Sequence, residues 1–168
     1  MKLTKILCIS VLFLTSCNNN SDYSDVIKFT EHVVGGNVKA VKLYLENQVD
    51  VNANVSGGLT PLMYAAGAPF MVSEYDRLKA GAIHTSTSNI VITEALIAAG
   101  AMLDQKDNTG NTALHYAIYN YRLDLVWILA VNGASFDLED NDGETGLTIA
   151  QDHGYDEILR MNHIINAR

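Results

Sequence analysis

Three residues between positions 84 and 88 are of the types that carry out nucleophilic catalysis. His84 precedes Ser86 and Ser88 by two and four residues. A catalytic serine needs a base within hydrogen-bond reach, a third group that orients the base, and a sharply turned backbone around the serine. The chain has no G-x-S-x-G motif at these serines and no acid at a recognised spacing. The pattern therefore does not indicate a hydrolase.

A second set of polar residues near the C-terminus contains types that bind metal ions. His153 and His163 lie near Asp152, Asp156 and Glu157. The chain has neither the H-E-x-x-H spacing nor the paired C-x-x-C spacing of zinc sites, and its glycines form no phosphate-binding motif. We therefore expect no metal, no cofactor, no catalytic residues and no small-molecule substrate, and the protein is not expected to be an enzyme.

Both cysteines lie near the start of the chain, at Cys8 and Cys17, so the remaining residues contain no thiol for a disulfide or a metal site. Lys2 and Lys5 precede an apolar run over residues 6–14 that is interrupted only by a serine. The run is too short to span a bilayer, which takes about 20 residues as a helix. A basic start followed by a short apolar run is typical of a signal peptide.

The sequence Leu14-Thr15-Ser16-Cys17 resembles the lipobox of bacterial lipoproteins. The resemblance implies that a signal peptide over residues 1–16 is removed and that Cys17 is lipidated, carrying palmitate or a similar acyl chain into a membrane. Residues 17–24 are then a polar tether. In bacteria with two membranes, Asn18 after the cysteine implies the outer membrane. Two alternatives remain open: an ordinary secretory signal with an unrelated cysteine, and a short buried helix.

The composition is that of one globular domain. The chain has 168 residues, of which 48% are hydrophobic and 18% are charged, and only two are prolines. The formal net charge of -8 argues against a nucleic acid or an anionic lipid surface as the main partner. A partner with a basic or mixed surface fits this charge better.

An internal repeat of 33 residues is the most specific pattern in the chain. Residues 107–117 (DNTGNTALHYA) align with residues 140–150 (DNDGETGLTIA), and residues 58–66 (GLTPLMYAA) align with both when an insertion of about nineteen residues is allowed. These segments resemble the ankyrin repeat, with its D-x-x-G-x-T-P-L-H-x-A opening and its G-A close. The resemblance covers residues 25–168.

The resemblance implies an all-α fold, a solenoid of about four helix-turn-helix repeats joined by short β-hairpin loops. We expect the repeats at residues 25–54, 55–106, 107–139 and 140–168, with an insertion at 68–88 in the second repeat. The two outer repeats are degenerate, as terminal repeats usually are. Within the insertion, the sequence predicts a short helix over residues 74–80.

A binding surface for another protein is the function that this fold implies, through its loop tips and first helices. His115 is the histidine of the repeat and is expected to serve the scaffold. Tyrosines are enriched at binding hot spots, and acidic residues lie at the loop tips. The predicted partner-binding residues are Tyr64, Phe70, Tyr75, Tyr116, Tyr119, Tyr121, Glu139, Asp142 and Glu144.

An alternative stays open for each part of this surface. The tyrosines could pad the first helices, the acidic residues could serve solubility alone, and the insertion could fold back over the stack. The family consensus would place glycine at Tyr121, so this position departs from the pattern.

The sequence thus predicts a lipid-anchored protein-protein interaction module of the bacterial cell envelope, at the outer membrane and facing the periplasm. One hypothesis is an immunity protein that blocks a delivered toxic enzyme such as a lipase. The alternative is an adaptor or scaffold for an endogenous periplasmic enzyme.

Overall fold

The computed structural model describes residues 23–68 and 86–167. The predicted signal peptide, lipidation site and short helix at 74–80 lie outside these residues. The described residues form eight α-helices and one short 3₁₀-helix. Their bounds are α1 Tyr23–Val34, α2 Val38–Glu46, η1 Ser56–Gly58, α3 Pro61–Ala66, α5 Ser86–Ala98, α6 Ala113–Tyr119, α7 Leu123–Val131, α8 Gly146–Asp152 and α9 Asp156–Asn166.

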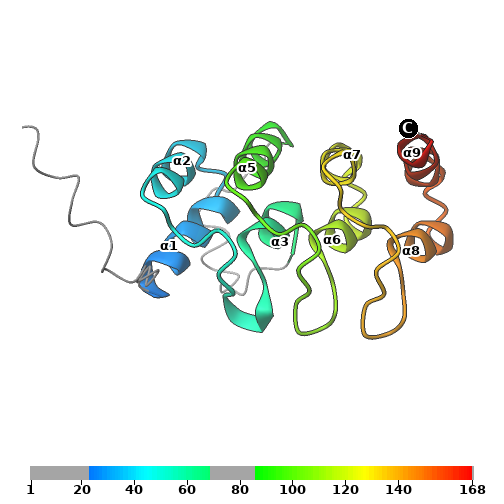
Figure 1. Cartoon of the computed structure of the whole chain (residues 1–168), viewed down its shortest axis with the longest axis horizontal. Helices are drawn as coiled ribbons and strands as arrows, with labels where there is room; N and C mark the ends of the chain where they lie inside the picture. Colours follow the sequence, from blue (N-terminus) through cyan, green and yellow to red (C-terminus); the bar gives the residue numbers. More distant parts are fainter. Residues whose placement is uncertain (1–22, 69–85, 168) are drawn as a thin grey trace, which may run out of the picture.

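The helices pair in chain order and the pairs stack side by side, as Figure 1 shows. The first helices α1, α3, α6 and α8 form one row, and the second helices α2, α5, α7 and α9 form a row above it. Each helix contacts its own partner and the corresponding helix of the next pair. The connections between pairs loop out on the far side of the first row. The expected all-α repeat fold is therefore confirmed.

A threonine cap begins the first helix of each of three pairs. The Oγ1 atoms of Thr60, Thr112 and Thr145 accept hydrogen bonds from backbone N–H groups three residues later, at 3.3, 3.4 and 3.2 Å. In return, the side chain three residues later accepts a bond from the threonine N–H. This reciprocal cap satisfies two N–H groups that a helix start leaves unpaired. The acceptor differs each time, being the sulfur of Met63, Nδ1 of His115 and Oγ1 of Thr148.

An aspartate closes each of the two loops that precede α6 and α8. Asp107 Oδ1 accepts the N–H groups of Thr109 and Asn111 at 2.8 and 2.9 Å, and Asp140 Oδ1 makes the equivalent pair of bonds in the next loop. Adjacent loop tips are also bonded to each other. The N–H of Asn141 donates to the carbonyl of Thr109 at 3.0 Å, so the loops are held in register across the stack.

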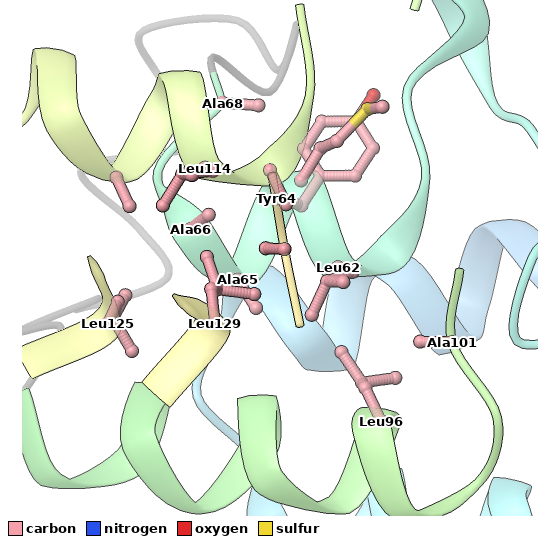
Figure 2. Close-up of a cluster of buried hydrophobic side chains, with 14 of the residues drawn as sticks. Leu62, Tyr64, Ala65, Ala66, Ala68, Leu96, Ala101, Leu114, Leu125 and Leu129 are labelled. Atoms are coloured by element: carbon pink, nitrogen blue, oxygen red, sulfur yellow. The ribbon is translucent and has the colours of Figure 1, made fainter. Parts of the chain in front are cut away.

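The core is continuous from one pair to the next. Ala65, Ala117 and Ala150 occupy equivalent places in α3, α6 and α8, and all are buried. A side chain of this size lets neighbouring helices approach closely. Ile92, Leu125 and Ile158 repeat in the same way along the second row and are fully buried. Figure 2 shows side chains from both rows converging in this cluster, among them Leu62, Ala65, Leu96, Leu114 and Leu129.

Two expectations about local structure need correction. The loops between pairs were expected to be β-hairpins, but the only β pairing within the described residues is an isolated bridge between Glu139 and Thr145. Side-chain and turn hydrogen bonds take the place of strand pairing. The insertion was expected to reach Ser88, but α5 begins at Ser86, so its first turn includes the final residues assigned to the insertion.

Two loop glycines give a matched test of the contact between loop tips. Gly110 and Gly143 have φ values of 83° and 80°, where any side chain is strained. A Cβ at Gly110 would also lie 2.6 Å from the backbone nitrogen of Asn141, whereas a Cβ at Gly143 would meet nothing within 4 Å. Gly143→Ala is expected to cost about 1 kcal/mol of unfolding free energy. Gly110→Ala is expected to cost about 1–3 kcal/mol more, because the backbone of the next loop must shift.

Urea unfolding followed by far-ultraviolet circular dichroism measures both variants. Equal losses for the two substitutions would contradict a close contact between the loop tips, since the two positions share the same backbone strain and differ only in that contact.

Candidate functional site

Three predicted site residues lie outside the described residues, namely Cys17, Phe70 and Tyr75. The residues that flank the insertion are described. Gly67, at the end of α3, has its carbonyl oxygen 3.3 Å from Nδ2 of Asn120, which donates to it. Gly36 lies next to Ser88 near the start of α5. Both flanks of the insertion therefore lie at the side of the stack where the two helices of each pair are connected.

Tyr64, one of the predicted partner-binding residues, is buried, so this prediction needs correction. Its side chain is only 5% exposed and belongs to the core cluster drawn in Figure 2. Burial accordingly raises the pKa of the Tyr64 hydroxyl. Tyr64 is in the middle of α3, where all six helical residues are buried, so it offers no surface to a partner.

Tyr116 occupies the repeat position equivalent to Tyr64 but is half-buried. Its hydroxyl donates a 2.6 Å hydrogen bond to Oδ2 of Asp107, the aspartate that closes the preceding loop. Burial and this bond raise the pKa of Tyr116. Burial alone would raise the pKa of Asp107, but the bonds from Tyr116, Thr109 and Asn111 together lower it. Tyr116 thus joins α6 to the preceding loop through its hydroxyl.

Tyr119 and Tyr121 are exposed, as predicted, with exposed fractions of 37% and 43%. The Tyr119 hydroxyl donates to Oε2 of Glu144 at 3.1 Å, and the Tyr121 hydroxyl donates to Oε2 of Glu157 at 3.1 Å. Burial and the bond to Glu144 raise the pKa of Tyr119 to about 12. The bond to Glu157 raises the pKa of Tyr121, and a bond from the Glu157 backbone N–H together with the bond from Tyr121 lowers the pKa of the Glu157 carboxyl. Glu144 lies in the loop before α8 and Glu157 lies in α9, so each bond crosses from one repeat to the next.

The three predicted acidic residues lie in and beside the loop before α8. Glu139 and Asp142 are exposed, and Glu144 is partly exposed. The Glu139 carbonyl accepts a 2.7 Å bond from Nζ of Lys106 in the preceding loop, and its backbone forms the bridge to Thr145. Among these three acidic residues, Glu144 has a side chain that is hydrogen-bonded to a predicted tyrosine, Tyr119.

Three residues absent from the predicted set complete this surface. His153 lies 6.5 Å from the ring of Tyr119 in an edge-on contact, and Tyr155 lies 4.5 Å from the ring of Tyr121. His153 and Tyr155 are themselves 5.3 Å apart, measured between ring centroids. Glu157 is the third missed residue. The signal in the sequence was the 33-residue offset, because side chains near the same repeat position in adjacent pairs lie next to each other.

Tyr121 is held in an unusual backbone conformation. Its φ is 51°, while Gly36 and Gly154, at the equivalent turns of the first and last pairs, have φ values of 66° and 69°. The left-handed region costs a residue with a Cβ about 1–2 kcal/mol, which glycine avoids. The departure from the glycine consensus therefore carries a real energetic cost at this turn.

His115 serves the scaffold, as expected. It is 1% exposed, and its Nδ1 accepts a hydrogen bond from the Thr112 N–H at 3.1 Å. A nitrogen that accepts this bond carries no proton, so the neutral ring has its proton on Nε2. Burial lowers the pKa of His115, while the backbone of Glu144 and of Leu138 opposes the shift.

Metal-binding clusters and membrane-spanning helices are both absent from the described segments. No group of three or more His, Cys, Asp or Glu side chains in residues 23–68 and 86–167 could hold a metal ion. None of the helices in the same ranges is long and apolar enough to cross a bilayer.

The fold and its exposed surface define an all-α repeat protein built for contact with another macromolecule. A comparison with known families agrees, since a model described as ankyrin repeats, in 3 copies, matches residues 79–161. The chain therefore contains ankyrin repeats, and these indicate a protein-protein interaction module. Proteins of this kind are typically not enzymes.

The capping role of His115 predicts a pH-dependent stability. Because the folded pKa is lowered from 6.5, the unfolded chain takes up a proton first as the pH falls. The stabilisation is complete above the unfolded pKa of about 6.5 and is lost below it, at no more than about 1.4 kcal/mol per pH unit. Glutamine at position 115 can still cap the helix but does not titrate. His115→Gln is thus expected to lose less unfolding free energy than the wild type between pH 7 and pH 5.

Urea unfolding at several pH values measures this difference. His163→Gln on α9 is the matched control, since His163 is exposed and the same exchange there leaves the cap formed by His115 intact. Parallel profiles for the wild type and His115→Gln would contradict the assignment.

Proposed function

We propose that this protein is held at the bacterial cell envelope by acyl chains on Cys17 and that its ankyrin repeats bind another protein there. The anchor is supported by the basic start, the short apolar run and the lipobox-like Leu14-Thr15-Ser16-Cys17. Two or three acyl chains make such anchoring effectively permanent. The proposed site is the outer membrane on its periplasmic side, because Asn18 follows the cysteine.

The observation that carries the binding role is the repeat stack with its exposed tyrosines. Stacked helix pairs form an extended, rigid surface whose shape does not depend on a ligand. Tyr119 and Tyr121 lie on that surface, each with a carboxylate from the adjacent pair. Tyrosine contributes a large, fairly rigid contact area at a small entropic cost, which suits a binding surface.

The more specific proposal is an immunity protein that blocks a toxic enzyme, such as a lipase, delivered into the periplasm. A membrane tether places the inhibitor where the toxin arrives, and a rigid stack can cover a catalytic cleft by steric occlusion. The small size and net charge of -8 suit a basic partner. The second candidate is an adaptor for an endogenous periplasmic enzyme, which the same tether and surface would serve.

Lipidation can be tested by labelling the full chain with radioactive palmitate in a bacterial host. Label is expected on the wild type, and Cys17→Ser is expected to abolish it, because the thiol is the acylation site. Cys8→Ser is the matched control, since that cysteine lies in the segment predicted to be removed, and it should retain the label. An unlabelled wild-type chain would reject the anchor.

The immunity role can be tested by deleting the gene in its own host and growing the deletion strain beside siblings that deliver toxin. The deletion strain is expected to be killed and to be rescued by the wild-type gene. Unchanged growth would reject immunity. For the adaptor, pull-down of the tethered protein from envelope extracts should recover one endogenous enzyme reproducibly, and recovery of none would reject it.

A further inference from the structure

Four aromatic rings form a continuous row across the last two helix pairs, in which Tyr119, Tyr121 and His153 are exposed and Tyr155 is partly buried against the core. Tyr119 contacts His153, His153 contacts Tyr155, and Tyr155 contacts Tyr121, with ring centroids 6.5, 5.3 and 4.5 Å apart. We call these four residues the aromatic row. It lies at the ends of α6 and α8 and at the turns that lead into α7 and α9.

Carboxylates lie at both ends of the aromatic row. Glu144 accepts a hydrogen bond from the Tyr119 hydroxyl, and Glu157 accepts one from the Tyr121 hydroxyl. These bonds orient the two carboxylates beside exposed rings. An ionised carboxylate has about four acceptor sites, so the Tyr119 bond to Glu144, and the Tyr121 and backbone bonds to Glu157, leave further sites on each acid. Neither acid is in a salt bridge in the part of the chain that the structure describes, where the ion pairs are Lys28–Asp25 and Arg122–Asp124.

The charge around the aromatic row has one sign over a long stretch of chain. Between Arg122 and Arg160 the sequence contains nine Asp and Glu residues and no Lys or Arg. Arg122 itself is bonded to Asp124 through two guanidinium nitrogens, each at 3.2 Å. A surface with this excess of acidic residues attracts cations, and Arg160, which interacts with Glu157, offsets the charge only in part.

Tyr121 is retained at this row against its backbone preference. The first and last pairs have glycine at the equivalent turn, where φ is positive, and this pair has tyrosine at φ 51°. Strain of this kind persists where the side chain has a use that outweighs it. The Tyr121 ring contacts Tyr155 and its hydroxyl holds Glu157, so the strained residue organises one end of the row.

We propose that the aromatic row binds an arginine side chain in a basic segment of the partner protein. The proposal rests on the proposed binding function and specifies its chemistry. A guanidinium is planar and weakly hydrated, stacks on aromatic faces and pairs with a carboxylate through two N–H groups. Exposed tyrosine rings beside oriented carboxylates offer both contacts at once. A lysine ammonium is more strongly hydrated and lacks the planar face, so it fits this surface less well.

The test uses fluorescein-labelled peptides of alternating serine and arginine, with two matched peptides in which lysine or citrulline replaces arginine. Binding to the full chain in detergent is followed by fluorescence anisotropy at low ionic strength. The arginine peptide is expected to bind about threefold to tenfold more tightly than the lysine peptide, and the uncharged citrulline peptide is expected to bind weakly. Equal binding of the arginine and lysine peptides would overturn the assignment to arginine.

Tyr121→Gly separates binding from folding. Glycine removes the ring but suits the positive φ, so the urea midpoint should stay the same or rise while affinity for the arginine peptide falls about threefold or more. Glu157→Gln should lower affinity similarly, because the amide keeps the shape and loses the charge. Tyr23→Ala is the control, since Tyr23 is an exposed tyrosine far along the stack, on α1.

Unchanged affinity in Tyr121→Gly, with folding intact, would overturn the proposal. This outcome is independent of the proposed function. Failure of palmitate labelling, or of the growth and pull-down experiments, would reject the envelope role without altering peptide binding. Loss of peptide selectivity would reject the aromatic row and leave the envelope role standing.

Discussion

Every feature of this molecule depends on the inability of one helix pair to bury its own apolar surface. A pair such as α6–α7 exposes Leu114 and Ala117 on one helix and Leu125 on the other, and these are buried only when the neighbouring pairs cover them. The buried alanines of α3, α6 and α8 let the neighbouring first helices approach closely. The bonds between adjacent loops, from the Asn108 N–H to the Gly57 carbonyl and from the Asn141 N–H to the Thr109 carbonyl, then hold neighbouring pairs in register so that the apolar faces meet.

The stacking of the helix pairs also determines which side chains remain exposed for binding. Side chains in the middle of a first helix face a neighbour, which is why Tyr64 is buried and Tyr116 is half-buried. Side chains at the helix ends and turns, such as Tyr119 and Tyr121, stay exposed. The aromatic row occurs there, and it is built from residues of two pairs whose relative position the buried core fixes. A binding surface formed in this way is rigid because the core beneath it is rigid.

Much of the fold could be predicted from the sequence because the turn and cap residues recur at a fixed offset. The T-x-x-[HMT] pattern after each loop marks the start of α3, α6 and α8, and glycines mark the helix ends. Exposure was harder to predict. Tyr64 and Tyr119 are both tyrosines of first helices, but the first is in the middle of its helix and the second is at the end.

The aromatic row was only half predicted, for a physical reason. Tyr119 and Tyr121 were found from residue type and local position, whereas His153 and Tyr155 join them through contacts between adjacent pairs. Such contacts depend on the stacking distance and on side-chain rotamers, and neither is encoded in a single repeat. The expected strands do not form in the loops before α6 and α8. Hydrogen bonds accepted by Asp107 and Asp140 close these loops without strand pairing.

The loop before α8 has a consequence for lengthening the array by design. In the preceding loop, the carbonyl oxygen of Thr109 accepts a hydrogen bond from the N–H of Asn141. Asp142 is the residue equivalent to Thr109 in the loop before α8. A grafted unit with asparagine at the matching position would thus find an acceptor already oriented. The obstacle would be the outward side of α8, where Thr148, Gln151 and Asp152 are exposed. Growth of this scaffold is therefore governed by the polarity of one helix face, and the geometry of its loops already permits it.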